Sequence, residues 1–251
     1  MDWKKYSEDL NKHLHLNSYP IGMRLYERAN EVPTMVKMQP QKVNICQLAT
    51  IARLYNWAVG SLNKNMICAL GAACLGMITT PKRIMEGEIN CGVYQKDLPA
   101  AKKMQEALPK LGKKQYEAVM FSSLERIPVD PEVIVIYGNP AQILRLVQAA
   151  LYHEGGKFDS STVGDAGLCN TIARVLLTKK PAMDLPCYGE RRFAAVQDHE
   201  TLFAYPAEYS QRIIEGLEGT HKGGVRYPIP VQLDWSPKMP KGFVLMDEDL
   251  E

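Results

Sequence analysis

The chain has 251 residues, of which 46% are hydrophobic and 23% are charged, and its formal net charge is +2. This composition is ordinary for a globular protein and excludes collagen-like, coiled-coil and disordered chains. The nearly balanced charge argues against nucleic acid as a partner, because phosphate-binding proteins carry a strong excess of Lys and Arg. One hydrophobic core can serve a chain of this length, so we expect a single domain over residues 1–251.

The sequence also argues against a membrane or secreted protein. No run of about 18 apolar residues is present, as a transmembrane helix would need. Residues 1–16 alternate charged and apolar side chains and lack the apolar core of a signal peptide. We therefore expect a cytoplasmic protein without membrane contact. Disulfides are rare in that reducing compartment, so the six cysteines are expected to be core residues, metal ligands or reactive thiols.

The first elements follow from the spacing of apolar residues. In residues 2–16 they recur every three or four positions, which predicts a short amphipathic helix. Residues 20–26 alternate as in a half-buried strand, and residues 32–42 contain two prolines and form a connection. Helical spacing returns over residues 45–59 and is closed by Gly60.

The middle of the chain holds one ambiguous segment and two strands. Residues 66–77 are uncharged and rich in Gly and Ala, which predicts either a buried helix or a tight loop around a cofactor. Residues 97–111 are predicted to be a surface helix. Strands are expected at 116–122 and 133–137, and the second is continuously apolar and therefore buried on both faces.

A tight turn joins the second strand to a helix. Gly138, Asn139 and Pro140 lead directly into an amphipathic pattern over residues 141–153, which is half of a βαβ unit. Asp165 is then expected to cap a further helix that ends near Thr178.

The last third is predicted to contain a loop over 181–189, a short strand over 192–196, a helix over 206–217 and an irregular tail over 231–251. The fold class expected from all these elements is α/β or α+β, a single compact domain with a mixed sheet flanked by helices.

No local motif identifies an enzyme class. The chain lacks a Walker loop, a GxGxxG turn, a GxSxG elbow, an HExxH helix and paired CxxC spacing. The cysteines are therefore the most informative residues, because thiolates are the usual ligands of iron–sulfur clusters at spacings that vary between families.

Four cysteines stand near a helix start or close to Gly or Pro, where backbone N–H groups can stabilise a thiolate. They are the candidate metal ligands Cys46, Cys68, Cys169 and Cys187. The alternative is that they pack as small apolar residues, which is the expected role of Cys74 between Ala73 and Leu75. Cys91 is assigned to neither role.

A second candidate site is the strand-to-helix turn at residues 137–142. Open sheets of α/β proteins bind ligands at such positions, and Asn139 and Gln142 would face the ligand. The alternative is a plain connection in which Asn139 caps the helix and Pro140 occupies its first position.

Arg191 and Arg192 are the candidate cationic groups for either site. Guanidinium groups suit carboxylate or phosphate ligands, and a nearby cation lowers the pKa of a thiol. Cys187 is therefore predicted to be the most readily ionised cysteine, on a surface loop. A solvated run of charge is the alternative interpretation of the two arginines.

Six segments, in this order, resemble the family called domain of unknown function 169: PIGMRLY, ICQLATIAR, MICALGAACLG, VIVIYGNPAQILRLVQAAL, GLCNTIA and LPCYGERRFA. The resemblance covers residues 18–230. It implies a protein common in anaerobic archaea and bacteria, with no established activity. It also implies family cysteines at Cys68, Cys169 and Cys187, with Cys46 a looser match.

Three functions are consistent with the sequence. The leading hypothesis is a cytoplasmic cofactor-binding or redox protein whose four cysteines hold an iron–sulfur cluster near Arg191 and Arg192. The second is an enzyme or carrier that binds a small anionic ligand at residues 137–142. The third is an oligomeric structural module without catalysis. The expected partner is a small molecule or a cluster, with a homo-oligomer as a further possibility.

Overall fold

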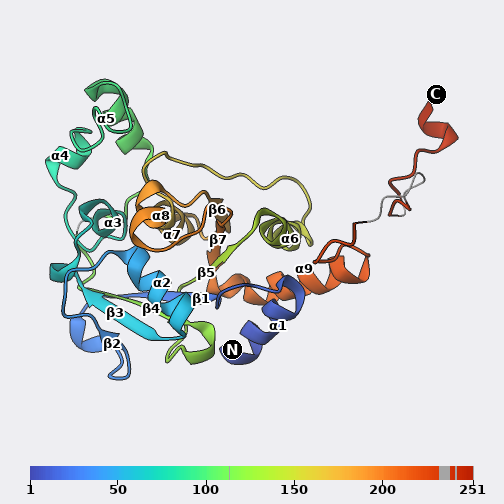
Figure 1. Ribbon diagram of the computed structural model, residues 1–251, viewed down its shortest axis with the longest axis horizontal. Helices are drawn as coiled ribbons and strands as arrows, with labels where there is room; N and C mark the ends of the chain where they lie inside the picture. The colour runs from blue at the N-terminus through green and yellow to red at the C-terminus, as the bar shows by residue number, and fades with distance from the viewer. Residues whose placement is uncertain (113, 232–237, 241, 251) are drawn as a thin grey trace.

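A computed structural model describes residues 1–112, 114–231, 238–240 and 242–250 (Figure 1). The strands are β1 (Ile21–Tyr26), β2 (Lys37–Met38), β3 (Ala58–Leu62), β4 (Ala118–Ser123), β5 (Val133–Gly138), β6 (Ala182–Asp184) and β7 (Thr201–Pro206). The helices are α1 (Trp3–Leu14), α2 (Ile45–Tyr55), α3 (Ala69–Cys74), α4 (Lys82–Met85), α5 (Leu98–Ala107), α6 (Pro140–Leu151), α7 (Leu168–Thr178), α8 (Tyr188–Phe193) and α9 (Ser210–Lys222). Short 3-10 turns lie at Ala29–Glu31, Asn63–Asn65, Leu124–Arg126, Ala207–Tyr209 and Asp247–Leu250.

The strands form one mixed, open sheet in the order β2-β3-β4-β1-β5-β7-β6. Only β2 and β3 pair in parallel among the described strands. At the centre, Met23 of β1 lies between Phe121 of β4 and Val133 of β5. The sheet therefore confirms the expected mixed sheet flanked by helices, in its α+β form.

The βαβ unit expected around residues 133–153 does not form. Strand β5 runs directly into α6, as predicted, but both neighbours of β5 in the sheet are antiparallel to it. The reason is that β7 inserts between β5 and the next strand, β6, which runs parallel to β5 at the edge of the sheet. The chain forms α7, the edge strand β6 and α8 before β7 returns beside β5.

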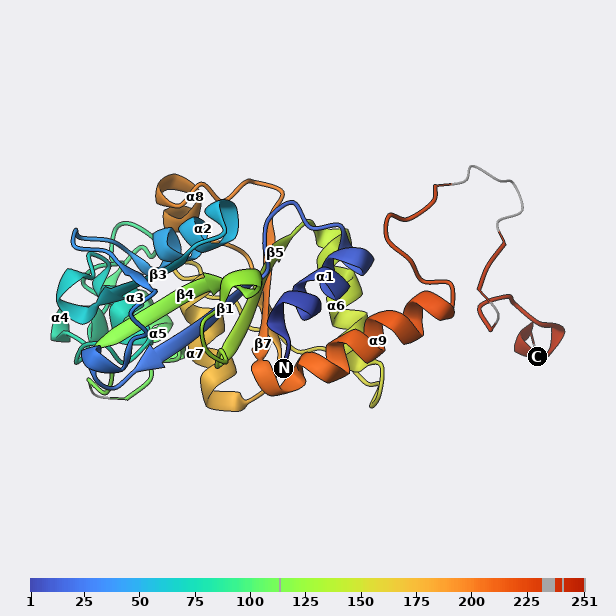
Figure 2. The same cartoon turned by 90° about the horizontal axis from the view of Figure 1, so that it is seen from below.

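The two faces of the sheet carry separate cores because side chains alternate along each strand. In β5, Val133, Val135 and Tyr137 pack in the core beneath α2, α3 and α7, whereas Ile134 and Ile136 pack with α1, α6 and α9. Figures 1 and 2 show the two groups of helices on either side of the sheet. The predicted cysteine ligands belong to elements of the first group or to α8 beside it.

The predicted end of the helix that begins at Ile45 was wrong. Helix α2 ends at Tyr55, where Asn56 takes a left-handed conformation, and Gly60 lies inside β3. A Cβ atom at Gly60 would stand 2.8 Å from the sulfur of Met38 and 2.9 Å from the carbonyl of Val119. Glycine is required there because neighbouring strands approach too closely for a side chain.

The region after residue 180 differs most from the prediction. The expected loop contains β6, and the expected strand at 192–196 is instead the end of α8 and an irregular segment. The buried strand β7, Thr201–Pro206, was missed. Helix α7 is preceded by Gly167, so Asp165 is not its cap. Of the expected tail over 231–251, residues 232–237, 241 and 251 lie outside the described residues.

No helix within the described ranges is both long and apolar enough to cross a lipid bilayer.

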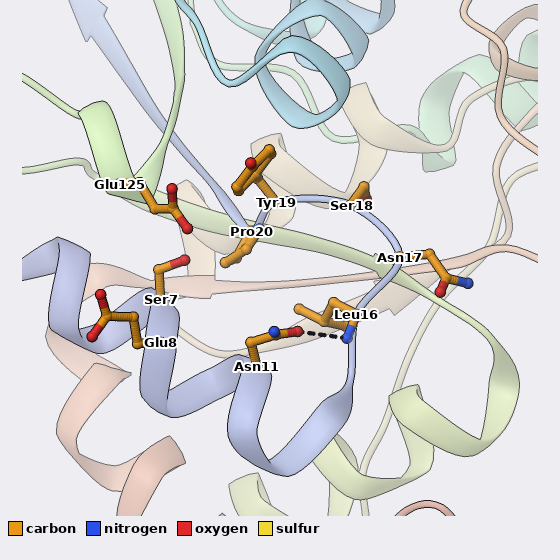
Figure 3. Close-up of a pocket in the computed structure, with 9 residues that line it drawn as sticks. All are labelled: Ser7, Glu8, Asn11, Leu16, Asn17, Ser18, Tyr19, Pro20 and Glu125. Atoms are coloured by element: carbon orange, nitrogen blue, oxygen red, sulfur yellow. Dashed lines mark hydrogen bonds between the residues drawn. The ribbon is translucent and has the colours of Figure 1, made fainter.

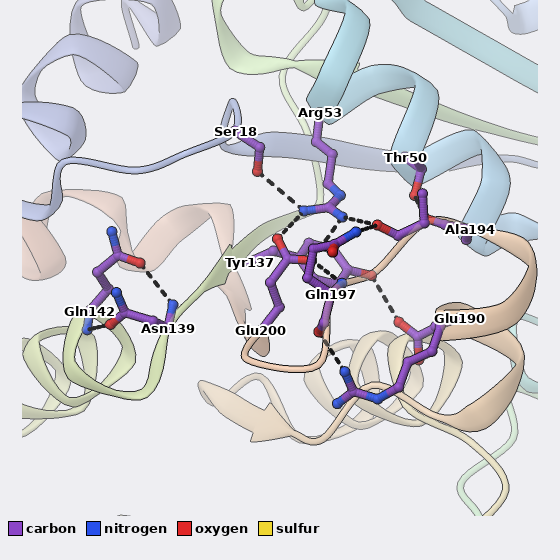
Figure 4. A network of polar contacts seen from close by, with 12 residues as sticks. Ser18, Thr50, Arg53, Tyr137, Asn139, Gln142, Glu190, Ala194, Gln197 and Glu200 are labelled. Atoms are coloured by element: carbon purple, nitrogen blue, oxygen red, sulfur yellow. Dashed lines mark hydrogen bonds and ion pairs between the residues drawn. The ribbon is translucent and has the colours of Figure 1, made fainter.

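A buried ion pair joins α2 to the segment that precedes β7 (Figure 4). Arg53 donates to Glu200 through Nη1 at 2.5 Å and through Nη2 at 3.0 Å, and these residues are 2% and 8% exposed. The guanidinium carbon also lies 4.5 Å from the centre of the Tyr137 ring. A carboxylate and an aromatic face thus compensate the buried cation.

We expect Glu200→Gln to lower the free energy of unfolding by about 3 kcal/mol, because it leaves a buried guanidinium without its counter-charge. Chemical denaturation of the wild type and the variant would measure the difference. Glu208→Gln, at an exposed position, is the matched control and should change stability by less than about 0.5 kcal/mol. Equal losses in the two variants would contradict this role of the pair.

Candidate functional site

Four helix N-termini meet around one cavity, and each carries a cysteine. Cys46 is the second residue of α2 and Cys169 the second residue of α7. Cys68 is the N-cap of α3 and Cys187 the N-cap of α8. All four line the same cavity of about 520 Å³. The structure therefore gathers the four predicted ligands from segments that lie far apart in the sequence.

Backbone N–H groups point at two of these sulfur atoms. The Cys68 thiol accepts a hydrogen bond from the N–H of Gly71 at 3.4 Å. The Cys187 thiol accepts from the N–H of Glu190 in the capping box of α8. Helix N-termini carry partial positive charge, so these contacts favour negative charge on sulfur.

Burial opposes that effect in the metal-free protein. It is the main reason that the pKa of Cys46 lies well above its ordinary value, and Glu190 and the neighbouring thiols raise it further. The pKa of Cys169 is also raised well above its ordinary value, first by a hydrogen bond with Cys74 and then by burial. Burial likewise raises the pKa of Cys68. These sulfur atoms are therefore neutral thiols at neutral pH.

The prediction that Cys187 ionises easily was wrong. Burial and then the Glu190 carboxylate raise its pKa to about 12. The nearby arginines do not offset this, because their guanidinium groups are engaged elsewhere. Arg191 donates to the carbonyl of Gln197 at 2.5 Å and lies 3.8 Å from Asp198. The exposed Arg192 contacts the hydroxyl and ring of Tyr188.

Glu190 is the functional residue that sequence reasoning missed. Its side chain is fully buried and accepts three hydrogen bonds, from the Tyr137 hydroxyl at 2.9 Å, the N–H of Leu168 at 3.0 Å and the N–H of Cys187 at 2.9 Å. Desolvation raises its pKa. The available signal was the capping-box spacing, in which a Glu stands three residues after an N-cap.

Gly167 makes room for that carboxylate. A Cβ atom at this position would lie 2.2 Å from Oε2 of Glu190 and 2.9 Å from the backbone nitrogen of Cys187. Glycine is therefore required at the start of α7, where the two cysteine-bearing segments approach each other.

The other predicted binding residues lie elsewhere and are used by the fold (Figure 4). Asn139 and Gln142 form a reciprocal capping box at the start of α6, with hydrogen bonds of 2.8 and 3.0 Å. The amide of Gln142 also donates to the carbonyls of Leu14 and His15, and that of Asn139 to the Tyr227 hydroxyl. These contacts match the plain connection that the sequence left open as an alternative.

A different cavity, of about 350 Å³, lies between α1 and the segment that precedes β1 (Figure 3). It is lined by Ser7, Glu8, Asn11, Leu16, Asn17, Ser18, Tyr19, Pro20 and Glu125. This lining contains no thiol and no basic side chain, so it fits neither predicted site.

We expect Glu190→Ala to lower the free energy of unfolding by at least about 3 kcal/mol, because three buried donors lose their acceptor. Glu190→Gln should cost only about 1 kcal/mol, since a rotated amide can accept from both backbone N–H groups and donate to the Tyr137 oxygen. Chemical denaturation measures both losses. If the two variants are equally stable, Glu190 does not hold these segments together.

Alkylation rates test the raised thiol pKa. Iodoacetamide reacts with the thiolate, so the labelling rate of Cys187 in the metal-free protein should rise about tenfold per pH unit from pH 7 to 10 without a plateau. The labelling rate of a small reference thiol with a pKa of about 8.5 should reach a plateau within this pH range. Mass spectrometry of the labelled peptide gives the rate. A plateau for Cys187 below pH 10 would show that its pKa is not raised.

Comparison with known proteins identifies relatives but no activity. The model of the family domain of unknown function 169, described as "Uncharacterised ArCR", matches residues 9–216. An uncharacterized protein of Methanocaldococcus jannaschii, MJ0308, is 31% identical over 202 residues, which are 79% of this chain and 86% of the relative. No solved structure matched the chain.

Proposed function

The chain belongs to the domain of unknown function 169 family, whose description assigns no activity, and we propose from the geometry of the cavity that it is a redox protein that holds an iron–sulfur cluster. Cys46, Cys68, Cys169 and Cys187 would be the ligands. The observation that carries the proposal is that all four thiols line one cavity. Four cysteine thiolates are the usual complement of one such cluster.

The local electrostatics support this assignment. Replacing four thiol protons by a cluster adds negative charge, and the converging N-termini of α2, α3, α7 and α8 compensate negative charge. Because burial raises the pKa of these thiols, a metal would have to displace their protons on binding. The same values argue against an exposed, permanently ionised catalytic cysteine.

A single metal ion has less support than a cluster. A single zinc ion holds four ligand atoms within about 2.3 Å of one point. Among the described residues, no three His, Cys, Asp or Glu side chains are grouped closely enough to hold one ion. A cluster carries several metal atoms, each with its own ligand, and so does not require four sulfur atoms around one point.

The walls of the cavity support a redox role. Ile45, Leu70 and Phe193 contribute apolar surface beside the thiols. Apolar surroundings limit the access of water and, with hydrogen bonds to sulfur, set the reduction potential of such centres. A bound cluster supplies one-electron transfer. The residues of this chain would ligate it, orient its ligands and limit its exposure.

All six cysteines are free in the structure. That state is compatible with a reducing compartment, and we propose the cytoplasm as the location. The anionic-ligand hypothesis has less support, because the side-chain amides of Asn139 and Gln142, which would donate to an anion, already donate to Tyr227, Leu14 and His15.

Anaerobic reconstitution with iron and sulfide tests the proposal. The wild type should retain roughly four irons per chain, if the cluster is of the four-iron type, and should absorb visible light. Serine variants of each proposed ligand, Cys46, Cys68, Cys169 and Cys187, should retain much less iron.

Cys91→Ser is the matched control, because Cys91 is not among the residues that line the cavity. Iron retention in this variant should equal that of the wild type. A colourless, iron-free wild type would reject the proposal, as would equal iron loss in Cys91→Ser and the four ligand variants.

A further inference from the structure

The chain carries an exposed apolar segment near its C-terminal end, followed by acidic residues. Residues 243–246, with the sequence FVLM, are between 51% and 75% exposed, and the exposed Glu248 and Asp249 follow them. Single exposed apolar side chains are common on protein surfaces, but contiguous exposed apolar residues commonly mark a binding surface. We call residues 243–249 the C-terminal segment.

Local hydrogen bonds hold this segment in a turn. The N–H of Phe243 donates to the carbonyl of Pro240 at 3.0 Å, and the N–H of Asp249 donates to the carbonyl of Met246 at 2.9 Å. The N–H of Met246 in turn donates to the Asp249 carboxylate at 2.8 Å. Such bonds restrict the conformations of the segment, so less entropy is lost when it binds to a surface.

A surface groove lies between α2 and the end of α8. Its volume is about 330 Å³, and its apolar wall includes Val43, Ile51 and the exposed rings of Tyr55 and Phe193. It adjoins the cavity of the four thiols, with which it shares Phe193 and Lys42. Aromatic side chains at a groove are frequent anchors of protein interfaces. We call this surface the α2–α8 groove.

The charges at this groove favour an acidic partner. Among the described residues that line it, only Lys42 is charged, and its ammonium donates to the neutral carbonyl of Lys64 at 2.6 Å. The guanidinium carbon of the exposed Arg192 lies 5.4 Å from the centre of the Phe193 ring, and Arg192 donates to the neutral hydroxyl of Tyr188. Because these contacts are with neutral groups, both positive charges can attract acidic side chains that approach the groove.

We propose that the C-terminal segment of one copy of the chain binds the α2–α8 groove of a second copy. Residues 243–246 would pack against the two aromatic rings, and Glu248 and Asp249 would lie near the two cations. A second copy is favoured over the same chain because the described C-terminal residues lie beyond α9, away from α2 and α8, in both views (Figures 1 and 2). This interaction goes beyond the proposed function and does not require a cluster, because the four thiols line the other cavity.

Sedimentation equilibrium of the full chain tests the inference. The average mass of the wild type should rise above the monomer mass as the protein concentration approaches about 100 µM. Leu245→Ser in the segment and Tyr55→Ser in the groove should each remain monomeric. Both side chains are exposed, so neither change removes a core contact. Leu144→Ser, at another exposed apolar position, on α6, is the matched control and should associate as the wild type does.

A monomeric wild type at this concentration would overturn the inference. Docking of the segment onto its own chain would give that result. Self-association that persists unchanged in Leu245→Ser and Tyr55→Ser would overturn it as well.

A labelled peptide with the sequence of residues 238–251 tests the contact itself. Fluorescence anisotropy should show that the peptide binds Leu245→Ser, whose groove is intact. Adding Tyr55→Ser to that variant should weaken binding at least about tenfold, because an aromatic anchor is lost. Glu248→Lys in the peptide should weaken binding about threefold at low ionic strength, and the difference should shrink at about 1 M salt.

The peptide results can also contradict the inference. Equal affinity of the peptide for Leu245→Ser and for the double variant would show that the groove is not its site. Equal affinity of the native and Glu248→Lys peptides at low ionic strength would show that charge does not select the segment, and either result would overturn the inference.

Discussion

The buried carboxylate of Glu190 is the contact on which the arrangement of the cavity depends. It binds the first N–H of α7, the N–H of Cys187 before α8 and the hydroxyl of Tyr137 on the central strand β5. Two cysteine-bearing helix starts are thereby fixed to each other and to the sheet. A carboxylate with no exposed surface is unfavourable unless its oxygens are hydrogen bonded, so these three donors are obligatory partners.

The same contact helps to explain why the thiols of the cavity are protonated at neutral pH. Burial raises the pKa of Cys46 and Cys187, and the Glu190 carboxylate raises it further. Helix N-termini act in the opposite direction, but they do not overcome desolvation without a positively charged partner. The cavity thus combines donors that suit bound thiolates with surroundings that keep free thiols protonated. This combination is typical of sites where metal binding and proton release are coupled.

Local patterns determined much of the fold. The strand at Val133–Gly138 and the helix at Pro140–Leu151 follow from a continuous apolar run, a cap and a proline, which act over a few residues. Such local patterns do not determine which strands pair with each other. The strand that pairs with β5 after α6 is decided by the position of β7 in the sheet. The sequence did not predict β7, whose six buried residues follow an irregular segment.

The sequence by itself determined which thiols to consider, because a cysteine near a helix start is a local feature that spacing and capping residues reveal. Only the tertiary structure decided that Cys46, Cys68, Cys169 and Cys187 share one cavity, since their convergence depends on the packing of four helix starts. The tertiary structure also determined whether these thiols are charged. Arg191 and Arg192 are next to Cys187 in the chain but bind other groups, whereas Glu190 turns inward beneath it. The pKa of a thiol depends on burial and on contacts in space, and the residues next to it in the sequence reveal neither.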